Sequence, residues 1–324
     1  MTEQTLQAKK DFSRMGLALF LVGIVSSVAQ VILGVVWTAY LQNTALGDQE
    51  IMMWILTFGP IYLLGVPAGL LVMKKVPPEN AAPQKLGFRR FWILMLMCMP
   101  IMYGGNIVGN LLSGLLSRGS AENPLLDYVM GNPLYSFLFT VLLAPVIEEF
   151  LFRKQIIDRL GKYGEKSAVV FSALTFALFH MNLFQFFYAF GLGLLFAYVY
   201  ARTRAIRYSI FMHMIINCLG SVIAPMLLSN LDMDLIAAME NGTATAEQIL
   251  HAGPALAGYY LYVLFLLAAS VGGLICLLRQ WGKHQFSPAV CPLPPKTIGK
   301  TAYRNAGVLL FLVFCLIMMA LSLI

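Results

Sequence analysis

The sequence predicts an all-α fold, a polytopic bundle of about nine transmembrane helices, and three observations lead to this prediction. Hydrophobic residues make up 59% of the 324 residues and charged residues only 11%, less than half of the roughly 25% typical of soluble domains. The mean hydropathy is +0.77. The hydrophobic residues gather into runs long enough to cross a bilayer, and the basic residues fall between alternate runs. Lipid is therefore expected to cover most of the chain.

Each hydrophobic run approaches or exceeds the roughly 20 residues that a helix needs to cross a membrane. The runs are 15–40, 51–73, 91–117, 134–153, 167–181, 185–201, 208–228, 255–278 and 306–324. The first is too long for the core of a signal peptide and has no clear cleavage site, so it is read as a spanning helix. Only Met181 to Phe184 separate the fifth run from the sixth. These two form either a tight hairpin or one broken helix, which would reduce the total to eight.

The charges between the runs indicate the orientation. Every Lys and Arg except Arg118 lies before the first run, at the end of an even-numbered run, or in the gap that follows one. The opposite loops contain acidic residues: Asp48, Glu50, Glu122, Asp127, Asp232, Asp234, Glu240 and Glu247. By the positive-inside rule, the amino terminus is inside and the carboxyl terminus outside. The net charge of +7 is explained by this topology, so no nucleic-acid partner is expected.

Three parts of the chain are distinguished. Residues 1–133 form an amino-terminal extension of three helices, 134–228 form a core that contains the unusual polar residues, and 229–324 contain an external loop and two further helices. A short amphipathic helix is expected within 229–254, and the prolines of 283–300 predict an extended linker. Of the five cysteines, four lie in hydrophobic runs and none forms a Cys-x-x-Cys pair, so disulfides and a thiolate metal site are not expected.

The fourth run ends in Glu148-Glu149 followed by Arg153. A charged group at the centre of a membrane helix costs roughly 2.5–3.5 kcal/mol, so such residues are functional candidates. Arg153 lies four residues after Glu149 on the same helix face and can pair with it. Glu148 is then the less compensated carboxylate and the candidate general base. The alternative left open is that both glutamates lie at the cytoplasmic interface, where Arg153 would mark the end of the helix.

Two further hydrophobic runs contain one histidine each. His180 follows Phe176 by four residues in the fifth run, and His213 precedes Asn217 by four residues in the seventh. Taken alone, His180 could be a packed histidine and Asn217 a contact between helices. The chain has four histidines, and the other two, His251 and His284, lie in predicted loops. Two Glu, two His and one Asn in a low-dielectric pocket could activate a water molecule against an amide.

These motifs resemble those of the type II CAAX prenyl endopeptidases and their bacterial relatives, the CPBP intramembrane peptidases. The family pattern is Glu-Glu-x-x-x-Arg, then Phe-x-x-x-His, then His-x-x-x-Asn, on successive membrane helices. The chain has Glu148, Glu149 and Arg153, then Phe176 and His180, then His213 and Asn217, with no departure at a motif position. The resemblance covers about residues 134–228.

The resemblance implies a catalytic set with distinct roles. Glu148 would activate the attacking water with help from His180, while His213 and Asn217 would bind the tetrahedral oxyanion. Glu149, Arg153 and Phe176 would support the site. No cofactor is favoured, although the family's Glu and His residues resemble zinc ligands, in which case Glu148, His180 and His213 would bind the metal. No His-Glu-x-x-His motif is present.

The resulting hypothesis is an intramembrane endopeptidase, resident in the plasma membrane if the chain is bacterial. It would cut a membrane-associated peptide or protein, with lipid-modified peptides among the candidates. One alternative is a scaffold or immunity-type protein that keeps the fold and acts by binding. Another is a proton-coupled transporter, although the His213–Asn217 pair has no evident task there. The sequence shows no internal repeat of the kind that many transporters contain.

Overall fold

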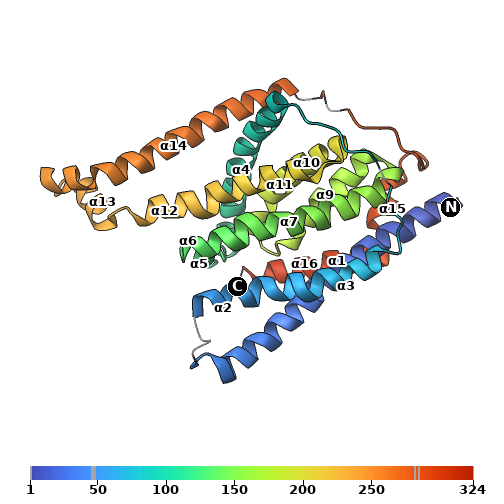
Figure 1. Cartoon of the computed structure of the whole chain (residues 1–324), viewed down its shortest axis with the longest axis horizontal. Coiled ribbons are helices and arrows are strands. Elements are labelled where there is room, and N and C mark those ends of the chain that lie inside the picture. The colour runs from blue at the N-terminus through green and yellow to red at the C-terminus, as the bar shows by residue number, and fades with distance from the viewer. Residues whose placement is uncertain (1, 45–48, 80, 281, 284, 324) are drawn as a thin grey trace.

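The computed structural model describes residues 2–44, 49–79, 81–280, 282–283 and 285–323. These residues form an all-α bundle without a strand, as predicted (Figure 1). Two positions named above, Asp48 and His284, lie outside the described residues.

The amino-terminal part contains three long helical runs, two of them with a π-helical turn. They are α1 (Glu3–Val36) with η1 (Trp37–Leu41), α2 (Gln49–Pro60) with η2 (Ile61–Gly65) and α3 (Val66–Met73), and α4 (Phe88–Leu116).

The core contains three long helical runs and the shorter α9. Its elements are α5 (Leu126–Val129), α6 (Pro133–Ser136), η3 (Phe137–Leu143), α7 (Ala144–Glu148), η4 (Glu149–Gln155), α8 (Ile156–Leu160), η5 (Gly161–Tyr163), α9 (Glu165–Phe179), α10 (Leu183–Thr203), α11 (Ile206–Cys218), η6 (Leu219–Ile223) and α12 (Ala224–Ser229). The carboxyl-terminal part contains α13 (Met233–Glu240), α14 (Ala246–Gln280), α15 (Ile298–Tyr303) and α16 (Ala306–Leu321). Here α13 is the short helix expected in the external loop.

Seven helical runs of the described chain are long and apolar enough to cross a membrane. They are Glu3–Leu41, Glu50–Met73, Phe88–Leu116, Pro133–Tyr163, Leu183–Thr203, Ile206–Ser229 and Ala246–Gln280. The chain is therefore an integral, multi-pass membrane protein. The remaining two predicted spans coincide with α9, which has 15 residues, and α16, which has 16. The total of nine crossings, the inside position of the amino terminus and the three-part division stay predictions.

Two helices extend well beyond the runs that the sequence indicated. The first begins at Glu3 rather than at residue 15, because the Thr2 side chain caps it. The fourth continues to Tyr163 rather than ending at residue 153. Arg153 does not mark its end: the side chain is fully buried and paired with Glu149, so helix formation continues past this charge.

The fifth and sixth predicted spans form a hairpin. Helices α9 and α10 pack against each other in opposite directions, joined by a turn in which Met181 has φ of 54°. Gly193 on α10 permits this approach, because a Cβ there would lie 3.2 Å from the Cα of Ala173 on α9.

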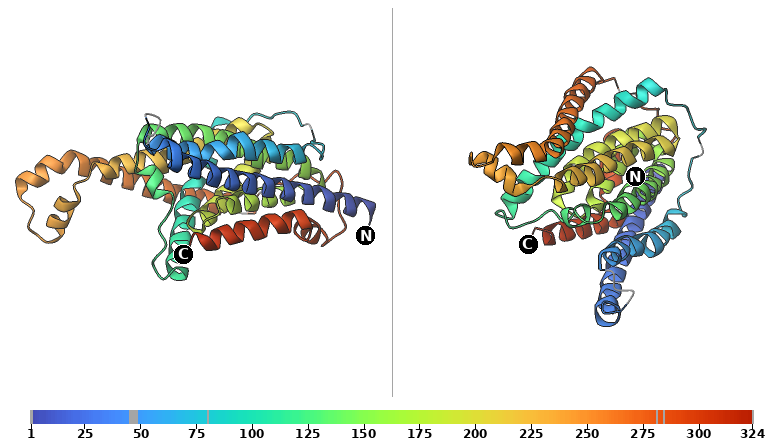
Figure 2. Two further views of the ribbon diagram at one scale, coloured as in Figure 1. Left: turned by 90° about the horizontal axis from the view of Figure 1, so that it is seen from below. Right: turned by 60° about the vertical axis from the view of Figure 1, so that its left-hand side comes forward.

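Two hydrophobic clusters lie on opposite sides of the core. One joins α1, α3, α9 and α16 through residues such as Phe12, Phe171 and Phe311. The other joins α4, α10, α11 and α14 through residues such as Met97 and Phe196. Figure 2 shows α14 projecting along the outside of the bundle, where it packs mainly on α4. The polar residues of the core lie between the two clusters.

Candidate active site

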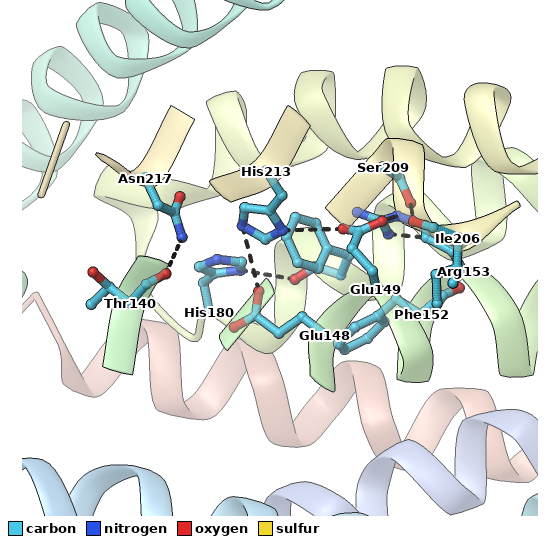
Figure 3. A network of polar contacts seen from close by, with 12 residues as sticks. Thr140, Glu148, Glu149, Phe152, Arg153, His180, Ile206, Ser209, His213 and Asn217 are labelled. Atoms are coloured by element: carbon cyan, nitrogen blue, oxygen red, sulfur yellow. Dashed lines mark hydrogen bonds and ion pairs between the residues drawn. The ribbon is translucent and has the colours of Figure 1, made fainter. Parts of the chain in front are cut away.

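The structure brings all seven motif residues together from three helical runs (Figure 3). Glu148 ends α7 and Glu149 begins the π-helical segment η4. His180 directly follows the last residue of α9, whereas His213 and Asn217 lie two turns apart in total on α11. The sequence therefore identified side chains that are neighbours in the folded chain.

Glu149 and Arg153 form a buried ion pair. The guanidinium Nε donates to Glu149 Oε2 at 3.1 Å, and both side chains are completely buried. Arg153 Nη1 donates to Ser172 Oγ at 3.3 Å, and this hydroxyl donates in turn to the Phe152 carbonyl at 2.8 Å. Breaking a buried pair of this kind leaves an uncompensated charge, so Glu149 is fixed by its partners.

His213 lies between the two glutamates. Its Nδ1 is 3.1 Å from Glu149 Oε1, and its Nε2 is 3.8 Å from Glu148 Oε2. Glu149 is buried, whereas the Glu148 side chain is 26% exposed. The adjacent carboxylates thus differ in environment: Glu149 is held by Arg153 and His213, and Glu148 remains accessible.

Aromatic rings enclose the charged groups. The Arg153 guanidinium lies 4.3 Å from the centre of the Phe176 ring and 6.0 Å from that of Phe196. His213 packs against the same two rings, at 5.8 and 5.4 Å between centroids. These rings shield the ion pair from water, which strengthens every electrostatic interaction inside the site.

His180 has a defined tautomer when neutral. Its Nδ1 is 2.9 Å from the Phe176 carbonyl oxygen, which can only accept, so this nitrogen carries a proton. The lone pair of the neutral ring is therefore on Nε2. The Phe176 ring meets the imidazole edge-on at 4.8 Å and fixes its orientation.

Asn217 is oriented by a backbone carbonyl of the neighbouring helix. Its Nδ2 donates to the Thr140 carbonyl at 2.7 Å. Thr140 lies in the π-helical segment η3, and π-helical turns are often found at functional sites. One of the two amide protons of Asn217 is used in this bond, and the other is available for a ligand.

Several contacting residues were missed in the sequence. Ser172 precedes Phe176 by four residues and Ser209 precedes His213 by four, so each motif extends by one polar residue along the same helix face. This spacing was a readable signal. Phe196 and the Thr140 carbonyl carry no such signal, because many phenylalanines lie in the chain and every residue has a carbonyl.

The side chains as placed do not fit the zinc alternative. Within the described part of the chain, no three His, Cys, Asp or Glu side chains are arranged so that they could hold a metal ion. Glu149 and the Nδ1 atoms of both histidines are already engaged by the protein. We therefore derive no catalytic step through a metal, and the metal-free reading stays a prediction.

Together, the helices define the membrane-embedded polar core of a helical bundle, and the comparisons identify its family. The model of the family "Type II CAAX prenyl endopeptidase Rce1-like" matches residues 130–219, the segment that contains every motif. The chain is also 27% identical over 158 residues to the "Putative membrane peptidase YdiL" of Bacillus subtilis (strain 168). The resemblance to the CPBP family is confirmed for this segment.

The similarity does not extend over the complete chains. The aligned part covers 46% of this chain and 63% of the Bacillus subtilis protein, so the chain spans less than two thirds of that relative. No solved structure matches the chain.

Proposed function

We propose that the protein is an intramembrane endopeptidase that hydrolyses a peptide bond in a membrane-associated peptide by means of a glutamate-activated water. The observation that carries this proposal is the unequal treatment of the two glutamates. Glu149 is buried and paired with Arg153, whereas Glu148 is accessible and approaches His213 only at 3.8 Å. A carboxylate with unused acceptor sites next to a histidine suits a general base.

The water is proposed to lie between Glu148 and His180. It donates one proton to the Glu148 carboxylate and the other to His180 Nε2, which has its lone pair free because Nδ1 donates to Phe176. A lone pair of the water then attacks the carbonyl carbon of the scissile bond. Glu148 takes up the proton as the oxyanion forms, and delivers it to the amine nitrogen when the C–N bond breaks.

The oxyanion is proposed to bind His213 Nε2 and the free amide proton of Asn217. Glu149 can only accept, so His213 Nδ1 carries a proton, and a proton on Nε2 as well makes the ring an imidazolium. An imidazolium and the Arg153 guanidinium balance the two carboxylates, so the resting site is neutral overall, which favours its burial. Each donor to an oxyanion can be worth about 3 kcal/mol.

The test is cleavage of a quenched fluorogenic peptide library by the purified protein in liposomes. Glu148→Gln and His180→Ala should each lower cleavage about 10²–10⁴-fold, because they remove the base and an acceptor of the water. Their matched controls are Glu247→Gln and His251→Ala, both at exposed positions of α14, which should retain full activity.

The same preparation tests the metal. Active protein should contain no stoichiometric zinc and should withstand prolonged chelation; zinc whose removal and return switched activity would overturn the mechanism. Full activity of Glu148→Gln would remove the general base. A wild-type protein that cuts no peptide would favour the scaffold function.

A further inference from the structure

Tyr62, outside the family segment, has a buried hydroxyl that no protein group satisfies. Its Oη is inaccessible to water and has no hydrogen-bond partner among the described residues. Most buried polar groups in proteins are hydrogen-bonded, so an unpaired one calls for an explanation. Tyr62 lies in η2, the π-helical turn that directly follows Pro60, and such turns are frequent at functional sites.

An aromatic ladder aligns Tyr62 with the catalytic helix. Trp54, Phe58 and Tyr62 follow one another at intervals of four residues, and the first two stack on Phe139 at 5.5 and 5.6 Å between centroids. The run from α2 to α3 and the run from α6 to α8 point in the same direction (Figure 1). Tyr62 therefore lies further along the catalytic helix than Phe139, toward Glu148.

Glu148 is the charged group that acts on the Tyr62 phenol. Glu148 itself accepts no hydrogen bond from the described residues, and its 3.8 Å approach to His213 is too long for one. The other tyrosine affected by Glu148 is Tyr188, whose phenol already pairs with Gln185. An unpaired donor therefore faces an unpaired acceptor.

We propose that Tyr62 is a positioning residue of the active site: its hydroxyl donates a hydrogen bond to the Glu148 carboxylate and directs it toward the attacking water. The role in catalysis rests on the proposed function, whereas the contact itself does not. The amino-terminal extension then completes a site that the family segment alone leaves unfinished, and Tyr62 keeps its proton throughout the reaction.

The first experiment compares Tyr62→Phe with Tyr128→Phe, using the library peptide that the wild type cuts fastest. Tyr128 belongs to the same aromatic group and hydrogen-bonds Thr57 Oγ1 at 2.7 Å, so its variant controls for loss of a hydroxyl. Tyr62→Phe should lower kcat about tenfold with KM unchanged. The acidic limb of its pH profile should move to higher pH, because a carboxylate that has lost a donor takes up a proton more readily.

Tyr128→Phe should match the wild type in kcat and in the pH profile. Wild-type kcat and an unmoved acidic limb in Tyr62→Phe would overturn the proposal. Equal losses in both variants without movement of the limb would also overturn it, because that result indicates packing alone.

The second experiment does not depend on activity. With 3-fluorotyrosine incorporated at position 62 or 128, the ¹⁹F resonance at 62 should shift on Glu148→Gln, and the one at 128 should not. A resonance at 62 that ignores Glu148→Gln overturns the contact. If the wild type cuts no peptide but the resonance at 62 shifts, the proposed function fails while the contact stands.

Discussion

Two charged clusters lie on the same helical run, Pro133–Tyr163, and they differ in almost every physical respect. The membrane cluster is Glu149, Arg153 and His213. The helix-end cluster is centred on Asp158, which pairs with Arg204 and Lys154 and accepts from Tyr200. Each contains an ion pair between residues four apart, at 3.1 Å in the first and 3.4 Å in the second.

Burial separates the two clusters. Both members of the Glu149–Arg153 pair are completely buried, whereas Lys154 is 48% exposed. Exposed pairs contribute little to stability, and buried pairs often contribute no more than apolar residues of the same size would. The helix-end cluster also joins segments: the Asp158 carbonyl accepts from the Glu79 amide, and Arg204 ends α10. We infer that the helix-end cluster fastens the fold and that the membrane cluster serves the chemistry.

The largest effect on stability is expected from Glu149→Gln. This change leaves the buried Arg153 without its carboxylate and should lower the free energy of unfolding by about 3–5 kcal/mol. Reversible unfolding in mixed micelles measures it.

The double variant Glu149→Leu with Arg153→Met sharpens the comparison, because it removes both charges together. It should lose less stability than Glu149→Gln, yet remain inactive, since His213 has lost the partner of its Nδ1. A double variant as active as the wild type would contradict the assignment of this cluster to catalysis.

A smaller effect is expected from Asp158→Asn. The amide can still accept from Tyr200, but the ion pair with Arg204 is lost, so stability should fall by about 1–2 kcal/mol. Cleavage should stay within about twofold of the wild type, because the residue lies beyond the catalytic side chains. A loss of activity as large as that of Glu148→Gln would mean that the two clusters act as one.

No effect on stability is expected from single cysteines at exposed positions of a cysteine-free chain, which test on which side the helix-end cluster lies. Cysteines that replace Lys85 and Val290 should react with an impermeant thiol reagent only after permeabilisation. One that replaces Glu240 should react from outside. External reaction at residue 85 would reverse the orientation inferred from the charges.

The sequence allowed prediction of the features that depend on local pattern. Hydrophobic runs located the helices, and spacings of four residues located Glu149–Arg153 and His213–Asn217 on shared faces. Helix ends were less predictable: a buried, paired Arg153 looks the same in the sequence as an arginine at the interface. Tyr62 could not be found at all, because its proximity to Glu148 arises from the packing of two helices separated by more than seventy residues.

The hairpin of α9 and α10 has a consequence for how the chain enters the membrane. At 1.5 Å per residue, the 15 residues of α9 span about 22 Å, less than the roughly 30 Å of hydrocarbon. Its polar turn would be left in lipid if α9 inserted by itself. Asn182 binds the His180 carbonyl, the Gln185 amide and the Gln185 side chain, but these bonds require α10. The two helices therefore leave the translocation machinery as one unit, and the catalytic His180 is delivered within it.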